Sequence, residues 1–115
     1  MKHIKLYEKY GVDYGTTPKV GDYVLVHIDK NDERNIGKKT LPHYDEYQEF
    51  INNNIGIIAH NYDNIEYEIL YHNIPESFYY MFYIDTISVD VESIIECYET
   101  EEDILALLSA KKYNL

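Results

Sequence analysis

The clearest alternation of apolar and polar residues along the chain lies in "KVGDYVLVHID", residues 19–29. Successive side chains of a strand point to opposite faces, so the alternation predicts a strand that follows a turn at Gly21-Asp22. One face of this strand carries Val24, Val26 and Ile28, and the other carries Tyr23, Leu25 and His27.

Apolar residues adopt a helical spacing in "YDEYQEFINNN", residues 44–54. Tyr44, Tyr47 and Ile51 recur at this spacing, with Phe50 beside them, and a run of asparagines ends the pattern. We therefore predict a short helix here. The preceding residues 30–42 are polar and turn-rich, which predicts a long exposed loop, and its basic residues are Lys30, Arg34, Lys38 and Lys39.

The segment "IGIIAHNYDNIEYEILYHN", residues 55–73, predicts a hairpin that turns at Asp63-Asn64. With a two-residue loop, the expected cross-strand pairs are Tyr62 with Ile65, His60 with Tyr67, and Ile58 with Ile69. One face then carries Ile58, Tyr67, Ile69 and Tyr71, and the other carries Asn61, Glu66 and Glu68. This division predicts a half-buried pair of strands.

An unbroken aromatic and apolar run, "FYYMFY" at residues 78–83, permits two interpretations. Such a run is typical of a strand covered on both sides, or of a turn that closes the end of a barrel. The alternative is an exposed aromatic strip that binds a partner. The sequence favours the buried interpretation.

The last part of the chain predicts an irregular segment, a strand through Ile94, Ile95 and Tyr98, and a helix at residues 100–113. Thr100 is the expected N-cap of that helix, and Asp103 occupies the capping-box position. Its apolar stripe consists of Ile104, Leu107 and Leu108, and Lys111 and Lys112 close it.

Length and composition are those of one domain, residues 1–115, in which residues 1–18 form an N-terminal arm or a first strand. The single cysteine, Cys97, excludes an internal disulfide and a cysteine-based zinc site. No apolar run reaches the roughly 18 residues of a membrane span. The start, "MKHIKLYEKYG", lacks the apolar stretch of a signal peptide. We therefore expect a cytoplasmic protein that does not bind membranes.

The net charge of −11 is distributed unevenly. Residues 1–39 contain eight Lys/Arg and six Asp/Glu, whereas residues 40–110 contain fifteen Asp/Glu and no Lys/Arg. These carboxylates must be solvated, meet the N-terminal basic residues, or meet a cationic partner. Proteins that bind nucleic acids directly carry basic surfaces, so this layout argues against direct binding to DNA or RNA.

The densest group of carboxylates is "ECYETEED", residues 96–103. Glu101, Glu102 and Asp103 fall in the first turn of the predicted helix. There the helix dipole and unsatisfied amides favour negative charge by about 0.3–1 kcal/mol each. Helix-start chemistry therefore explains three of the five carboxylates and leaves Glu96 and Glu99 without a structural reason.

Motifs for catalysis and metal binding are missing from the sequence. The five histidines are isolated, the glycines do not cluster into a phosphate-binding loop, and Cys97 has no evident histidine partner. We expect no metal, no cofactor and no enzymatic activity. An enzymatic alternative predicts a concave pocket that contains a carboxylate with a strongly perturbed pKa.

Several short segments resemble small uncharacterised SH3-like barrel proteins of bacteriophages and large DNA viruses. They are "MKHIKLYE", "KVGDYV", "FINNNIG", "NIP", Ile94-Ile95 with the acidic helix start, and "KKYNL". The resemblance implies a viral origin and an SH3-like fold. It transfers no functional residues, because that family has no established activity. The acidity of "ECYETEED" departs from those proteins, which are more mixed in charge there. "MKHIKLYE" also permits a second interpretation, as an address that directs proteins into a capsid.

Together these observations predict a mainly β (α+β) protein: a small SH3-like β-barrel with a short inserted helix and a C-terminal helix. We expect a non-enzymatic viral accessory protein that binds another protein through an aromatic groove with an acidic rim. The expected binding residues are Tyr79, Tyr80, Tyr83, Glu96, Glu99, Glu101 and Glu102. The alternative is an acidic nucleic-acid mimic that inhibits a host defence or nucleic-acid enzyme. Binding by a mimic weakens steeply with salt, whereas aromatic docking persists.

Overall fold

The structure is a computed structural model that describes residues 17–29 and 38–113. The predicted N-terminal arm or strand therefore lies outside the described residues, apart from Thr17 and Pro18, and so do Lys30 and Arg34. The elements, in chain order, are β1 (Tyr23–Val26), α1 (Tyr44–Asn53), β2 (Ile55–Tyr62), β3 (Glu66–Leu70), the 3-10 helix η2 (Glu76–Met81), β4 (Thr86–Asp90), the 3-10 helix η3 (Val91–Ser93), β5 (Ile94–Tyr98) and α2 (Glu101–Tyr113).

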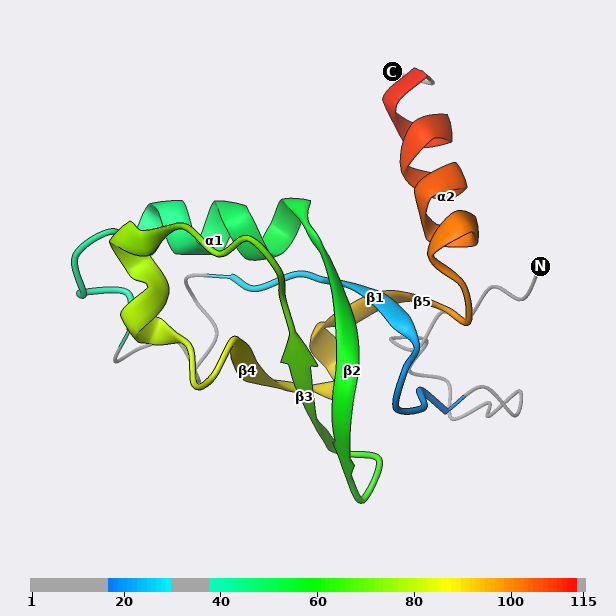
Figure 1. The fold of residues 1–115 in the computed structure, drawn as a ribbon, viewed down its shortest axis with the longest axis horizontal. Coiled ribbons are helices and arrows are strands. Elements are labelled where there is room, and N and C mark those ends of the chain that lie inside the picture. Colours follow the sequence, from blue (N-terminus) through cyan, green and yellow to red (C-terminus); the bar gives the residue numbers. More distant parts are fainter. Residues whose placement is uncertain (1–16, 30–37, 114–115) are drawn as a thin grey trace.

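The five strands form one antiparallel sheet in the order β4-β3-β2-β1-β5, so the last strand returns to pair with the first (Figure 1). The predicted fold class, small and mainly β with two α-helices, is confirmed. The predicted closed SH3-like barrel is not confirmed. Within the described residues no pairing joins β4 to β5, and the sheet stays open.

The strand β1 separates two apolar clusters, as the alternation of its residues predicts. Val24 and Val26 belong to the main core, which lies between the sheet, α1 and η2. Leu25 belongs to a second, smaller cluster with Tyr98 of β5 and Ile104 of α2. In Figure 1, α1 covers one side of the sheet, whereas α2 projects from the end of the molecule farthest from η2.

The predicted turn at Asp63-Asn64 is present, and both residues have positive φ. The register differs near the turn, because Tyr62 pairs with Glu66 and His60 pairs with Glu68. An irregularity between Ile58 and His60 restores the predicted pair of Ile58 with Ile69. Ile58, Tyr67, Ile69 and Tyr71 are buried as predicted, but His60 replaces Asn61 on the face that carries the glutamates.

Gly56 allows the closest approach within the main core. A Cβ atom at this position would lie 2.9 Å from Cζ of Tyr71 and would also collide with Cγ2 of Ile69. The absence of a side chain therefore lets these two buried residues pack directly over the backbone of β2.

The aromatic run 78–83 is divided between inside and outside, so neither interpretation of it holds for the whole segment. Residues 78–81 of the run form the end of η2 rather than a strand, and Phe82 and Tyr83 follow η2. Phe78 and Phe82 are buried, whereas Tyr79, Tyr80 and Tyr83 are exposed. The phenylalanines anchor the segment to the core and the tyrosines remain on the surface.

Candidate functional site

Exposed aromatic and apolar side chains gather where η2 leads into β4. Tyr79, Tyr80, Tyr83 and Ile84 expose 41, 54, 73 and 70% of their surface. We call these four residues the aromatic end. Large apolar side chains that cluster on a surface are typical of interaction sites, whereas single ones are common everywhere. The three predicted tyrosines therefore lie together and accessible.

Hydrogen bonds hold two of these tyrosines in place. Tyr79 donates its hydroxyl hydrogen to Oδ1 of Asp85 at 2.8 Å, and this bond raises the pKa of Tyr79. Tyr80 donates to the carbonyl oxygen of Pro42 at 2.6 Å. Side chains that are ordered before a partner arrives lose less conformational entropy on binding. The aromatic end is thus partly preorganised.

A tight turn presents the remaining two side chains. Tyr83 and Thr86 exchange backbone hydrogen bonds of 2.8 and 3.0 Å, and Ile84 and Asp85 between them have φ of 45° and 65°. Asp tolerates this left-handed region, but a β-branched residue rarely adopts it. Ile84 is therefore a strained residue with an exposed side chain, and strained backbone conformations cluster at functional sites.

Behind the aromatic end lies a cluster of aromatic rings in the core. The centroids of Phe78 and Phe50 are 5.6 Å apart, and the ring of Phe82 meets that of Tyr47 edge-on at the same distance. Tyr79 stacks on Phe82 at 6.3 Å. The exposed ring of Tyr79 is thereby in contact with a tightly packed interior.

A groove of about 410 Å³ runs between α1 and the start of η2. Phe50 and Phe78 contribute its aromatic part, and the latter also anchors the segment that carries the aromatic end. We call this feature the acidic groove, and its lining residues are Glu46, Glu49, Phe50, Asn53, Asn54, Pro75 and Phe78.

The end of the basic segment reaches this region. The Nζ atom of Lys38 lies 5.4 Å from the ring centroid of Tyr47 and 3.4 Å from its hydroxyl. Burial lowers the pKa of Lys38. Lys39 lines a neighbouring hollow with Asp45 and Glu46. Lys30 and Arg34, the other basic residues of the loop, lie outside the described residues.

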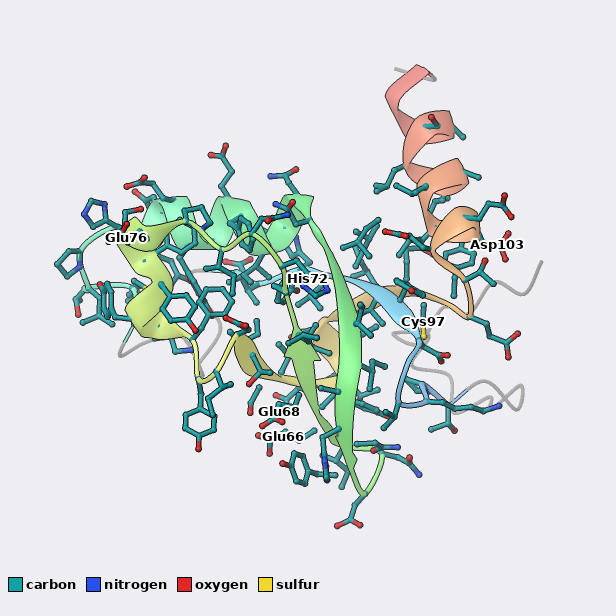
Figure 2. All side chains as sticks on the ribbon, in the orientation of Figure 1. Glu66, Glu68, His72, Glu76, Cys97 and Asp103 are labelled. Carbon is teal, nitrogen blue, oxygen red and sulfur yellow. The ribbon has the colours of Figure 1, made fainter. Side chains whose placement is uncertain are left out.

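The carboxylates predicted to form the acidic rim do not lie beside the aromatic end. Glu96 is buried, with 5% exposed, and accepts a side-chain hydrogen bond from Tyr98. Glu99, Glu101 and Glu102 are exposed, but they lie at the start of α2. Figure 2 places Asp103, in that first turn, far from Glu76 of η2. The carboxylates near the aromatic segment are instead Asp85, which is bonded to Tyr79, and Glu46 and Glu49, which line the groove with Phe78. The sequence analysis did not single out these three residues.

The start of α2 has the chemistry expected of a helix N-terminus. The amide of Asp103 donates to Oγ1 of Thr100 at 3.2 Å, which confirms the predicted N-cap. Glu101, Glu102 and Asp103 occupy the first turn. Their position there is explained by the unsatisfied amides and the dipole of the helix.

Cys97 is buried in β5 and its thiol donates to Oδ2 of Asp22 at 3.4 Å. The same carboxylate oxygen accepts the amide hydrogen of Lys19 at 2.9 Å. Burial and the nearby Asp22 raise the pKa of Cys97, which keeps the thiol protonated. A protonated, buried thiol is a poor nucleophile.

Among residues 17–29 and 38–113, no three His, Cys, Asp or Glu side chains converge as a metal site would require. The described helices are also too short or too polar to cross a membrane. Comparisons with protein-family models, with curated proteins and with solved structures found no match.

Proposed function

We propose that the protein is a non-enzymatic binding module that docks another protein onto its aromatic end. The observation that carries this proposal is the exposed cluster of Tyr79, Tyr80, Tyr83 and Ile84. Tyrosine is enriched at protein interfaces because its ring supplies apolar area and its hydroxyl supplies a hydrogen bond. Preorganisation by Asp85 and Pro42 supports the same role.

The shape of the acidic groove supports binding rather than catalysis. Five of its seven lining residues are exposed, so the groove lies open on the surface. Catalytic sites usually exclude water from the reacting groups, and this groove does not.

We also propose that the open sheet is related to the SH3-like barrel that the sequence resemblance implies. Support comes from the strand order, in which β5 returns to pair with β1 after a meander from β2 to β4. The viral origin, the accessory role and the cytoplasmic location remain predictions from the sequence.

The alternative, an acidic mimic of nucleic acid, has less structural support. Exposed carboxylates lie on α1 (Glu46, Glu49) and at the start of α2 (Glu101, Glu102), near different ends of the molecule. A mimic needs a row of charges that follows a phosphate backbone. The mimic alternative makes one clear prediction: binding of the partner is lost at high salt.

Crosslinking from the aromatic end tests the proposal. A photo-crosslinking amino acid replaces Tyr83, which is 73% exposed, in the full-length tagged chain. Captured proteins from host lysate are identified by mass spectrometry at low and high salt. We expect a partner that crosslinks from position 83, survives high salt, and is lost in the double variant Tyr79→Ser/Tyr80→Ser.

Two controls separate the surfaces. A crosslinker at Ser88, which is exposed on β4, should capture nothing in common with position 83. The variant Glu101→Gln/Glu102→Gln should retain the partner. Loss of the partner in this variant, together with loss at high salt, would overturn the proposal in favour of the mimic.

A further inference from the structure

We infer that the partner segment is a basic peptide, and that an arginine side chain of it lies in the acidic groove beside the aromatic end. This inference rests on the proposed protein-binding function and names the chemistry of the partner. It is carried by the lining of the groove, which combines an aromatic floor with two carboxylates and with amide oxygens that accept hydrogen bonds.

The polar lining begins with two carboxylates on α1. Glu46 and Glu49 are exposed and three residues apart, so they lie on one side of the helix. Glu46 is hydrogen-bonded to His43, and Glu76 on η2 follows Pro75 of the lining directly. Among the described residues, no Lys or Arg belongs to this lining, and Lys39 lines the neighbouring hollow that shares Glu46. The described lining therefore carries a net negative charge, with Glu46 bonded to His43 and Glu49 beside it.

Two asparagines complete the set of acceptors. Asn53 donates its amide hydrogen to the carbonyl oxygen of Glu49 at 2.7 Å, and Asn54 donates to that of Phe50 at 2.8 Å. Each NH₂ group gives one of its two hydrogens to the helix, and the amide oxygen of each side chain can accept a hydrogen bond from a ligand. Every polar side chain of the groove then offers oxygen acceptors, and the complementary ligand is a donor-rich cation.

The aromatic floor selects the kind of cation. Phe50 is half-buried and lies with Phe78 at a centroid distance of 5.6 Å, and Pro75 continues the apolar surface. A guanidinium group stacks on aromatic faces and donates two parallel hydrogen bonds to a carboxylate. Its aliphatic stem also packs on apolar surface. A lysine ammonium is a compact, strongly hydrated charge that uses this geometry less well.

The arrangement of exposed residues favours a peptide over a small molecule. The groove opens along α1, and Phe78 connects it to the tyrosines of η2. An extended segment that places arginine over Phe50 can continue across Tyr79, whose ring stacks on Phe82. Residues 40–110, which supply the described lining, contain no Lys or Arg, so this lining is complementary to a basic chain.

Titration with synthetic peptides tests the inference on the full-length chain. The probe is a short glycine-serine peptide with two arginines, and the matched peptides carry lysine or citrulline, a neutral analogue of arginine, at the same positions. Amide shifts of the isotope-labelled protein are followed by NMR. We expect shifts at Glu49, Phe50, Asn53 and Phe78, and an affinity for the arginine peptide at least about tenfold above that for the citrulline peptide.

Charge-matched variants locate the binding. Glu46→Gln/Glu49→Gln should lower the affinity for the arginine peptide about tenfold. Glu101→Gln/Glu102→Gln removes the same charge at the start of α2 and should change this affinity less than about twofold. Asn53→Arg introduces a cation in the groove and should block the peptide. Ser88→Arg introduces the same cation on β4 and should not.

The outcomes separate this inference from the proposed function. The inference of a basic peptide is overturned if the arginine and citrulline peptides bind with equal affinity. It is also overturned if the two glutamate double variants lose equal affinity for the arginine peptide. In either case, the proposed protein-binding function still stands if Tyr79→Ser/Tyr80→Ser loses the crosslinked partner. If the peptide binds only after Lys30→Gln/Arg34→Gln, the groove is occupied by the chain's own basic segment, and the inference is likewise overturned. Shifts confined to the groove, with the expected order of affinities, support it.

Discussion

At the scale of single residues, Ile84 carries the clearest conflict between side chain and backbone. The other described non-glycine residues with positive φ are histidine, aspartate and asparagine, which tolerate the left-handed region. Ile84 is β-branched, and this conformation costs it about 1–2 kcal/mol. Its side chain is 70% exposed, so burial does not offset that cost. The strain makes sense if the side chain contacts a partner.

We predict that Ile84→Asn raises the free energy of unfolding by about 1 kcal/mol, because Asn adopts positive φ at lower cost. The same variant should weaken capture of the partner at the aromatic end. Denaturant unfolding followed by circular dichroism measures the first effect, and crosslinking from position 83 measures the second.

The matched control is Ile65→Asn. Ile65 is also an exposed isoleucine next to a turn, at 63%, but it is not among the residues with positive φ. Its replacement should leave stability within about 0.5 kcal/mol. Equal effects of the two variants on stability would show that Ile84 is not strained.

At the scale of elements, side chains of α1 form hydrogen bonds with the backbone of the segment that follows β1. The amide of Ile28 donates to Oδ1 of Asn52 at 2.8 Å, and Nδ2 of Asn52 donates back to the carbonyl oxygen of Ile28 at 3.3 Å. Gln48 donates to the same carbonyl at 3.0 Å. These bonds satisfy the backbone of a buried residue and fix the position of the acidic groove.

We predict that Asn52→Ala lowers the free energy of unfolding by about 1–3 kcal/mol, because the buried amide of Ile28 loses its partner. Asn53→Ala is the control, since Asn53 is exposed and bonds only within its own helix; it should cost less than about 0.5 kcal/mol. Denaturant unfolding of both variants checks the difference. Similar losses would mean that the bonds to Ile28 contribute little.

The sequence predicted most elements because their apolar spacing is regular. β1, α1, the hairpin turn and the helix start at Thr100 all follow from local patterns. It missed β4, since "TISVD" is short and follows a turn whose first central residue, Ile84, is an unusual choice for positive φ. It also missed η2, because six consecutive aromatic and apolar residues have no periodicity to read.

The candidate site was predicted in part for a similar reason. The exposed tyrosines lie within one short segment, so the sequence alone predicts that they are close together. The acidic rim depends on which helix packs against that segment, and local sequence does not contain that information. Glu96 looked like a surface residue among other carboxylates, but pairing of β5 with β1 places it in the interior. A weak signal did exist for Glu46 and Glu49, which lie three residues apart on a predicted helix.

At the scale of the whole molecule, buried phenols make stability depend on alkaline pH. Burial raises the pKa of Tyr67 to about 12. Burial, followed by the charges of Glu96 and Asp103, raises the pKa of Tyr98 to about 12. Both values exceed the ordinary value of about 10, so the folded state favours the neutral phenol.

We predict that this contribution to stability is fully present below about pH 10 and is lost as the pH rises from 10 toward 12. Circular dichroism against pH follows the fold, and near-ultraviolet absorbance of phenolate follows ionisation. Tyr67 and Tyr98 should ionise only as the fold is lost. Ionisation of every tyrosine in one step near pH 10, with the fold intact, would contradict the prediction.

The pairing of β1 with β5 joins Val24 to Cys97, so the sheet is completed by residues from opposite ends of the described chain. During synthesis, β1 leaves the ribosome roughly 70 residues before its partner, which at about 5–20 residues per second amounts to several seconds. Until then β1 has an open edge, and Leu25 lacks the cover of Tyr98 and Ile104. The nascent chain must therefore stay soluble with an incomplete sheet, and the high density of carboxylates in residues 40–110 provides the charge repulsion that keeps such chains apart.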